Sequence, residues 1–117
     1  MLKRNVYEHI NRKNGTIKKK LWLTRLRILK LWKDHFNCLL CAYCLNELDE
    51  NEKNSQAPLF PTIDHIIPII RGGDLSSPKN LVISCYECNQ KKGRRMNIKP
   101  IYYFQDSGNG KWKINTI

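Results

Sequence analysis

An aspartate and a histidine stand side by side near the middle of this 117-residue chain, at Asp64 and His65, and Asn89 follows farther along. A histidine titrates near neutral pH and can take a proton from water. Carboxylate and carboxamide oxygens are ligands that Mg²⁺ accepts. Hydrolysis of a phosphodiester needs such a base, together with a divalent cation that neutralises the charge developing on the phosphate oxygens. The three residues therefore indicate a metal-dependent hydrolytic site, with His65 as the base and Asp64 and Asn89 as metal ligands.

Each of these residues also has an ordinary structural explanation. Asp64 could stabilise a turn, His65 could be a core histidine with satisfied hydrogen bonds, and Asn89 could cap a short helix. The segment Thr62–Ile67 is rich in β-branched residues and is followed by Pro68, which predicts a strand that ends there. Neighbouring side chains on a strand point to opposite faces, so Asp64 and His65 converge on one phosphate only if the strand end bends.

Five cysteines form a second group of chemically active residues, at Cys38, Cys41, Cys44, Cys85 and Cys88. Their odd number argues against a disulfide framework, and two CxxC pairs are typical of a metal site. Four thiolates from the 41/44 and 85/88 pairs suit a closed, tetrahedral structural zinc with no open position for catalysis. Cys38 and Cys41 also form a CxxC, but we favour the 41/44 pair and expect Cys38 to be a small buried side chain near the zinc.

An amphipathic helix is the first element expected to support these sites, over residues 18–36. Its apolar residues fall within one arc of about 160° at 100° per residue, which predicts core packing. They are Leu21, Trp22, Leu26, Ile28, Leu29, Trp32 and Phe36. Leu23 and Leu31 lie off this arc, while Arg25 and Lys33 intrude on it.

The remaining elements are short. Residues 49–58 are polar and rich in breakers, which indicates an exposed loop, and 81–83 lead into the second cysteine pair as a strand. Residues 89–92 predict the start of a short helix that Gly93 ends. Residues 101–117 predict a hairpin that turns at Ser107–Gly110, because apolar residues alternate with polar ones after the turn.

The charge of the chain indicates a polyanionic partner. Lys and Arg number 21 against 10 Asp and Glu, a formal net charge of +11. Residues 1–40 carry +9 and residues 91–117 carry +6, whereas residues 41–90 carry −4. Two basic flanks favour nucleic acid over a membrane surface or a merely solvated exterior. We predict that four residues after the second cysteine pair contact the phosphate backbone, namely Lys91, Lys92, Arg94 and Arg95.

The order of these motifs resembles a known family. The run CAYC … TIDHIIP … GG … NL … CYECN … K is similar to the HNH endonucleases, over roughly residues 38–95. The resemblance implies a zinc-stapled ββα-metal core, in which Cys41, Cys44, Cys85 and Cys88 are the structural zinc ligands. It also implies products with 5′-phosphate and 3′-hydroxyl ends.

The resemblance assigns roles residue by residue. His65 corresponds to the general base and Asp64 to a ligand of the catalytic metal. Asn80 corresponds to the central Asn, which braces a loop and orients the histidine. Asn89 occupies the third position, often His, so this is an H-N-N variant whose preference for Mg²⁺ or Mn²⁺ stays open.

We therefore expect an α+β fold in a single compact domain. It would comprise a basic N-terminal extension and helix (1–37), an HNH nuclease core (38–95) and a C-terminal hairpin (96–117). The expected function is DNA phosphodiester hydrolysis, with a homodimer possible if both strands are cut. The alternative is a non-catalytic zinc-knuckle module that binds nucleic acid. No apolar run approaches the ~18–20 residues of a membrane span, and no signal peptide is recognisable, so we expect a cytoplasmic protein.

Overall fold

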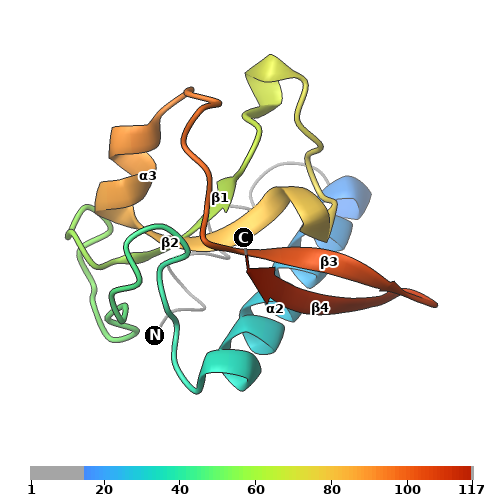
Figure 1. The fold of residues 1–117 in the computed structure, drawn as a ribbon, viewed down its shortest axis with the longest axis horizontal. Coiled ribbons are helices and arrows are strands. Elements are labelled where there is room, and N and C mark those ends of the chain that lie inside the picture. Colours follow the sequence, from blue (N-terminus) through green and yellow to red (C-terminus); the bar gives the residue numbers. More distant parts are fainter. Residues whose placement is uncertain (1–14, 117) are drawn as a thin grey trace.

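The computed structural model describes residues 15–116, and side chains from residue 24 onward (Figure 1). Within these residues, two α-helices and two antiparallel strand pairs make an α+β fold, which confirms the expected class. In chain order the elements are α2 (Gly15–Phe36), β1 (Pro61–His65), η1 (Ile69–Arg71), η2 (Pro78–Asn80), β2 (Leu81–Cys85), α3 (Tyr86–Lys92), β3 (Tyr102–Gly108) and β4 (Lys111–Thr116).

The centre of the fold is the unit β1–β2–α3. β1 and β2 pair antiparallel in a regular register, with Asp64 opposite Val82 and His65 opposite Leu81. All five residues of β2 are buried. α3 follows β2 without a loop, because the Cys85 thiol at the N-cap accepts a hydrogen bond from the Cys88 amide. A helix starting at Asn89 was therefore a wrong expectation: the first turn of α3 holds the cysteine pair itself.

α2 packs its apolar face against this unit. Ile28 and Trp32 are fully buried, and the Trp32 indole Nε1 donates to the Leu40 carbonyl at 2.7 Å. Trp32 also meets Phe104 of β3 edge to face, with ring centroids 5.5 Å apart. The helix begins at Gly15 rather than Lys18. The predicted apolar face is confirmed from Leu26 onward, whereas Leu21 and Trp22 lie outside the described side chains.

Leu31 was expected to lie off the apolar face, and this was only partly right. It is half-buried and packs at the edge of the core.

Among the described residues no helix combines the length and apolarity that crossing a membrane requires.

The C-terminal hairpin closes the fold on the side of α2. Asn109 and Gly110 form its two-residue turn, and both have positive φ (54° and 72°), as a type I′ turn requires. The Arg27 guanidinium of α2 donates to the Gly110 carbonyl at 2.6 Å. The hairpin predicted for residues 101–117 is confirmed, but its turn is shorter than the expected Ser107–Gly110, because β3 runs on to Gly108.

Candidate active site and metal centre

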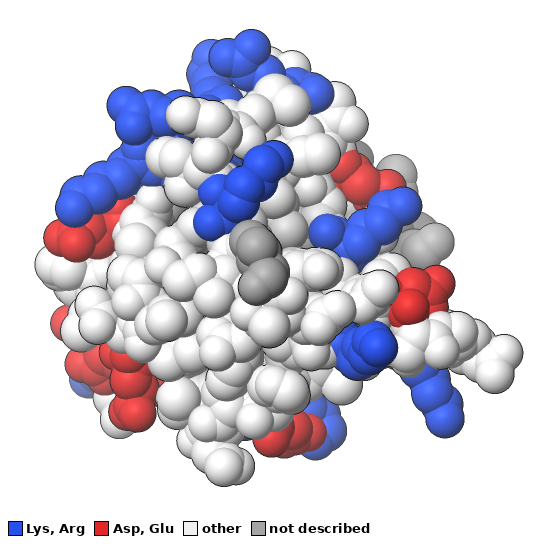
Figure 2. Space-filling model, viewed as in Figure 1, with Lys and Arg blue, Asp and Glu red and all other residues white. Residues whose placement is uncertain are grey.

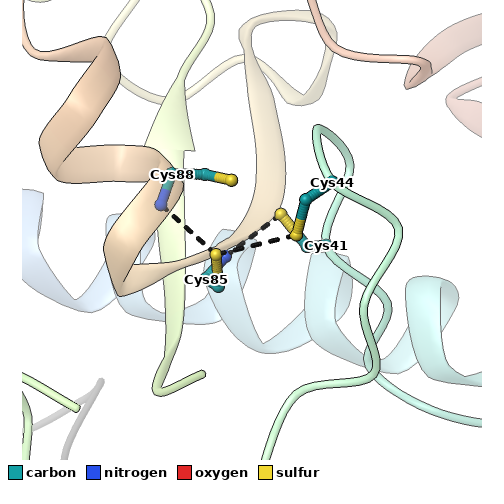
Figure 3. A group of neighbouring side chains, drawn as sticks. All are labelled: Cys41, Cys44, Cys85 and Cys88. Atoms are coloured by element: carbon teal, nitrogen blue, oxygen red, sulfur yellow. Dashed lines mark hydrogen bonds between the residues drawn. The ribbon is translucent and has the colours of Figure 1, made fainter. Parts of the chain in front are cut away.

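Two turns bring four cysteines together. The Sγ atoms of Cys41, Cys44, Cys85 and Cys88 all lie within 4.8 Å of one another (Figure 3). The Sγ atoms of Cys44 and Cys85 are 3.9 Å apart. Zn–S bonds of about 2.3 Å in a tetrahedron place sulfurs roughly 3.8 Å apart, so this group fits a closed structural zinc.

Backbone amides stabilise the thiolate form of two of these cysteines. Cys85 N donates to Cys41 Sγ and Cys88 N donates to Cys85 Sγ, both at 3.3 Å. Burial raises the pKa of Cys85 to about 11 and also raises that of Cys88. Burial opposes ionisation of Cys41 too, but amides of the two cysteine turns hold its pKa below the usual value. Thiolates crowded in this way need a cation to offset their charge, which is what a zinc ion supplies.

Cys38 lies outside this cluster. It is half-buried rather than fully buried, and its pKa is raised by burial and by the nearby Glu47 and Glu50. The four-cysteine group thus comprises the 41/44 and 85/88 pairs that the spacing favoured.

Asp64 is a buried carboxylate facing α3. The hydroxyl of Tyr43 donates to its Oδ2 at 2.5 Å, and Lys92 Nζ lies 3.3 Å from the same oxygen. Both contacts engage Oδ2, so Oδ1 is the oxygen that a cation would take. Tyr43 lies between Cys41 and Cys44 of the four-cysteine group, so Asp64 hydrogen-bonds directly to the turn that carries this cysteine pair.

Asn89 lies on the side of α3 that faces β1. Its Nδ2 donates to Thr62 Oγ1 at 3.1 Å. Thr62 and Asp64 share one face of β1, because residues two apart on a strand point the same way. Asn89 and Asp64 therefore come from facing elements, and the Asn89 Oδ1 has no hydrogen-bond partner among the described residues. Asn89 is in the middle of α3, so it does not cap that helix.

The β1–β2 register stays regular through Asp64 and His65, so the bend that was expected to bring both side chains to one phosphate is not seen in the strand itself. His65 is the last residue of β1, and the Asp64 charge acts on its imidazole. Its Nε2 lies 2.9 Å from the Leu75 carbonyl. A carbonyl only accepts, so Nε2 carries the proton and Nδ1 keeps a free electron pair. Burial lowers the pKa of His65, and the charges of Arg25 and Lys92 add to this, against the Leu75 carbonyl and Asp64. The imidazole is therefore neutral at pH 7, as a general base must be.

Asn80 braces the loop that carries the Leu75 carbonyl. Its Oδ1 accepts from the Ile67 amide at 2.8 Å, and its Nδ2 donates to the carbonyls of Ile67 (3.0 Å) and Asp74 (2.8 Å). Only glycine fits at position 73 beside these hydrogen bonds, because a Cβ there would lie 1.8 Å from the Ile67 carbonyl oxygen. Asn80 thus acts on His65 through the loop, at a distance from the imidazole itself.

The four basic residues expected at the phosphate backbone separate into two kinds. Lys91, Arg94 and Arg95 are exposed. Lys92 is not, since only 1% of it is accessible and its Nζ also donates to the His65 carbonyl at 2.8 Å. The expectation of a phosphate contact is wrong for Lys92 in this structure, because its ammonium is taken up by Asp64 and the backbone of β1. In Figure 2, Lys and Arg side chains gather over the upper half of the face, around α3, the loop after it and η1.

Two residues at the site were not singled out from the sequence. Tyr43 had no signal beyond its place inside a cysteine pair. Arg25 did give a sequence signal, because it interrupts the apolar face of α2 one turn before Ile28 and Leu29. Its Nε is buried without a hydrogen-bond partner among the described residues.

The comparison with protein families agrees with this geometry. Residues 41–95 match the family model described as HNH endonuclease. The matched segment contains both cysteine pairs, β1, β2 and α3. The segment is therefore an HNH endonuclease domain, from a family of nucleases. A search of curated proteins found no match to the chain.

Proposed function

We propose that this protein is a metal-dependent endonuclease that hydrolyses phosphodiester bonds in DNA. The observation that carries the proposal is the state of His65. The imidazole is neutral, its Nε2 is anchored on a carbonyl, and its Nδ1 has no hydrogen-bond partner among the described residues, at the end of a strand that also holds Asp64. A neutral imidazole held at one ring nitrogen leaves the other nitrogen to take a proton from water.

In the proposed mechanism, His65 Nδ1 takes the proton of the attacking water. The Nε2–H bond to the Leu75 carbonyl holds the ring in place and stabilises the imidazolium that forms. A Mg²⁺ or Mn²⁺ ion bound through Asp64 and Asn89 would supply charge stabilisation at the phosphate and the leaving oxygen. Lys92 and Tyr43 hold the Asp64 carboxylate in position. The products carry 5′-phosphate and 3′-hydroxyl ends, as the family resemblance implies.

The substrate is held by its phosphates. Lys91, Arg94 and Arg95 lie at the end of α3 and just beyond it, next to the Asn89 side of the site. We assign residues 38–95 as the nuclease core, with the segments 1–37 and 96–117 as flanks. One such site cuts one strand at a time, so cleavage of both strands at once would point to a homodimer.

Plasmid cleavage tests this proposal. Zinc-loaded protein is incubated with supercoiled plasmid and added Mg²⁺ or Mn²⁺, and parallel reactions receive no divalent ion beyond the bound zinc. Relaxed circles that form only with the added metal support a nicking enzyme, and linear product indicates paired sites. A gel shift without cleavage under every metal would instead favour the zinc-knuckle binding module.

A further inference from the structure

An apolar projection follows the catalytic strand directly. Four large apolar side chains between residues 66 and 75 are exposed to solvent: Ile70 by 66%, Ile69 by 49%, Leu75 by 42% and Ile67 by 37%. The turn η1 contains no buried residue. In Figure 1 this segment is the yellow-green turn at the top of the view, where it extends beyond β1. We refer to Ile67, Ile69, Ile70 and Leu75 as the apolar knob.

The apolar knob is held rigidly in this exposed position. The amides of Arg71 and Gly73 both donate to the Pro68 carbonyl, at 2.8 and 3.1 Å. The Asn80 side chain fixes Ile67 and Asp74 from below. The backbone of Gly73 packs closely against Ile67, because a Cβ at position 73 would lie 1.8 Å from the Ile67 oxygen. A rigid exposed apolar projection is costly in water and indicates a surface that it is built to meet.

Two exposed basic residues flank the apolar knob, Arg71 on η1 and Lys79 on η2. The loop also holds one exposed carboxylate, Asp74, which accepts hydrogen bonds from the amides of Ser76 and Ser77. The Leu75 carbonyl of the same loop holds the proposed catalytic base His65. The partner of this surface must therefore be anionic around an apolar centre and must lie next to the reacting phosphate, and duplex DNA has this chemistry.

We propose that the apolar knob enters the minor groove of duplex DNA beside the scissile phosphate and packs against the bases. This inference rests on the proposed function and adds how the substrate is held. The major groove is about 12 Å wide and accommodates a helix or a two-stranded ribbon, whereas a single tight turn matches the minor groove of about 6 Å. Apolar side chains in that groove wedge partly between base steps, while flanking cations neutralise phosphates.

The salt dependence of binding separates the two kinds of contact. Fluorescence anisotropy with a labelled DNA duplex, without added Mg²⁺, gives the Kd at several salt concentrations. The double variant Ile69→Ser/Ile70→Ser binds about tenfold or more weakly at every salt concentration, with the slope of log K against log salt unchanged. Arg71→Ala instead reduces that slope by about one. Leu59→Ser removes a similarly exposed apolar side chain outside the knob and leaves Kd unchanged.

A second probe addresses the groove itself. Wild-type protein prefers a duplex with flexible TA steps over an A-tract duplex, because wedging must deform the DNA, and the double variant loses this preference. Equal affinity of the double variant and wild type for both duplexes, with an unchanged melting temperature, overturns the proposal. So does a change in oligomeric state without a change in DNA affinity, which would make the knob a contact between copies of the chain. Because the assay measures binding, a wild-type protein that binds this way but never cleaves would refute the proposed function and not this inference.

Discussion

Replacing Lys92 with methionine distinguishes a structural lysine from one that contacts DNA. The Lys92 side chain is 1% exposed and that of Asp64 is 7% exposed, with Nζ 3.3 Å from Oδ2. Removing one partner of a buried ion pair leaves the other charge without compensation and costs about 3–5 kcal/mol. The His65 carbonyl loses a donor as well. Against a total stability of about 5–15 kcal/mol for a domain, this is a large fraction.

The assay is thermal unfolding of the zinc-loaded protein followed by circular dichroism. Lys92→Met should lower Tm by roughly 12–40 °C, given about 4–8 °C per kcal/mol for small domains. The neighbouring Lys91→Met is the matched control. Its ammonium is exposed and pairs only loosely with Glu87, at 3.6 Å, so stability should change by less than about 0.5 kcal/mol. A Lys92→Met protein that melts with wild type but binds DNA with a smaller salt slope would refute the buried-pair reasoning.

Four further predictions follow from the site. Tyr43→Phe removes the donor to the buried Asp64 carboxylate, at a cost of about 1–3 kcal/mol, so cleavage should slow while zinc content, measured by a chromogenic chelator, stays at wild type; full activity would exclude a positioning role. Gly73→Ala forces a Cβ against the Ile67 carbonyl and should abolish cleavage and lower Tm, whereas a wild-type rate would show that the loop does not hold His65. Cys88→Ser should lower zinc content and unfold the core, and one zinc per chain with an unchanged Tm would contradict its role as a ligand. Because burial lowers the pKa of His65, the imidazole stays neutral at pH 7, and the cleavage rate should fall only when the pH drops below 6.5, the ordinary pKa of a histidine. A cleavage rate that already falls above pH 7 would count against His65 as the base.

The sequence predicted the elements whose chemistry is local. The Asn-Gly pair at 109–110 specifies a hairpin turn without reference to the rest of the chain. The CxxC spacing likewise indicates two turns that share one metal, and the structure brings the four sulfurs together. The hairpin turn and the spacing within each CxxC are local signals, whereas the meeting of the two cysteine pairs depends on the tertiary fold.

Lys92 and Tyr43 show why the rest was not predictable. Lys92 is one of several basic residues in a row, and only the packing of α3 on β1 turns it toward Asp64 while Lys91 faces solvent. Tyr43 contacts Asp64, 21 positions along the chain, because the turn that carries Cys41 and Cys44 lies beside β1. The start of α3 was missed for a different reason, since a cysteine that acts as N-cap and metal ligand at once lacks the usual Ser, Thr, Asp or Asn signal.

The most direct test of the central claim is the single-turnover cleavage rate of a DNA duplex by His65→Ala, compared with wild type at saturating protein and Mn²⁺. His35→Ala, which changes an exposed histidine on α2, serves as the control. Loss of a general base predicts a fall of about 10²–10⁴-fold in the rate, with DNA affinity and zinc content unchanged. A His65→Ala rate within a few fold of wild type would contradict the claim that this histidine activates the water.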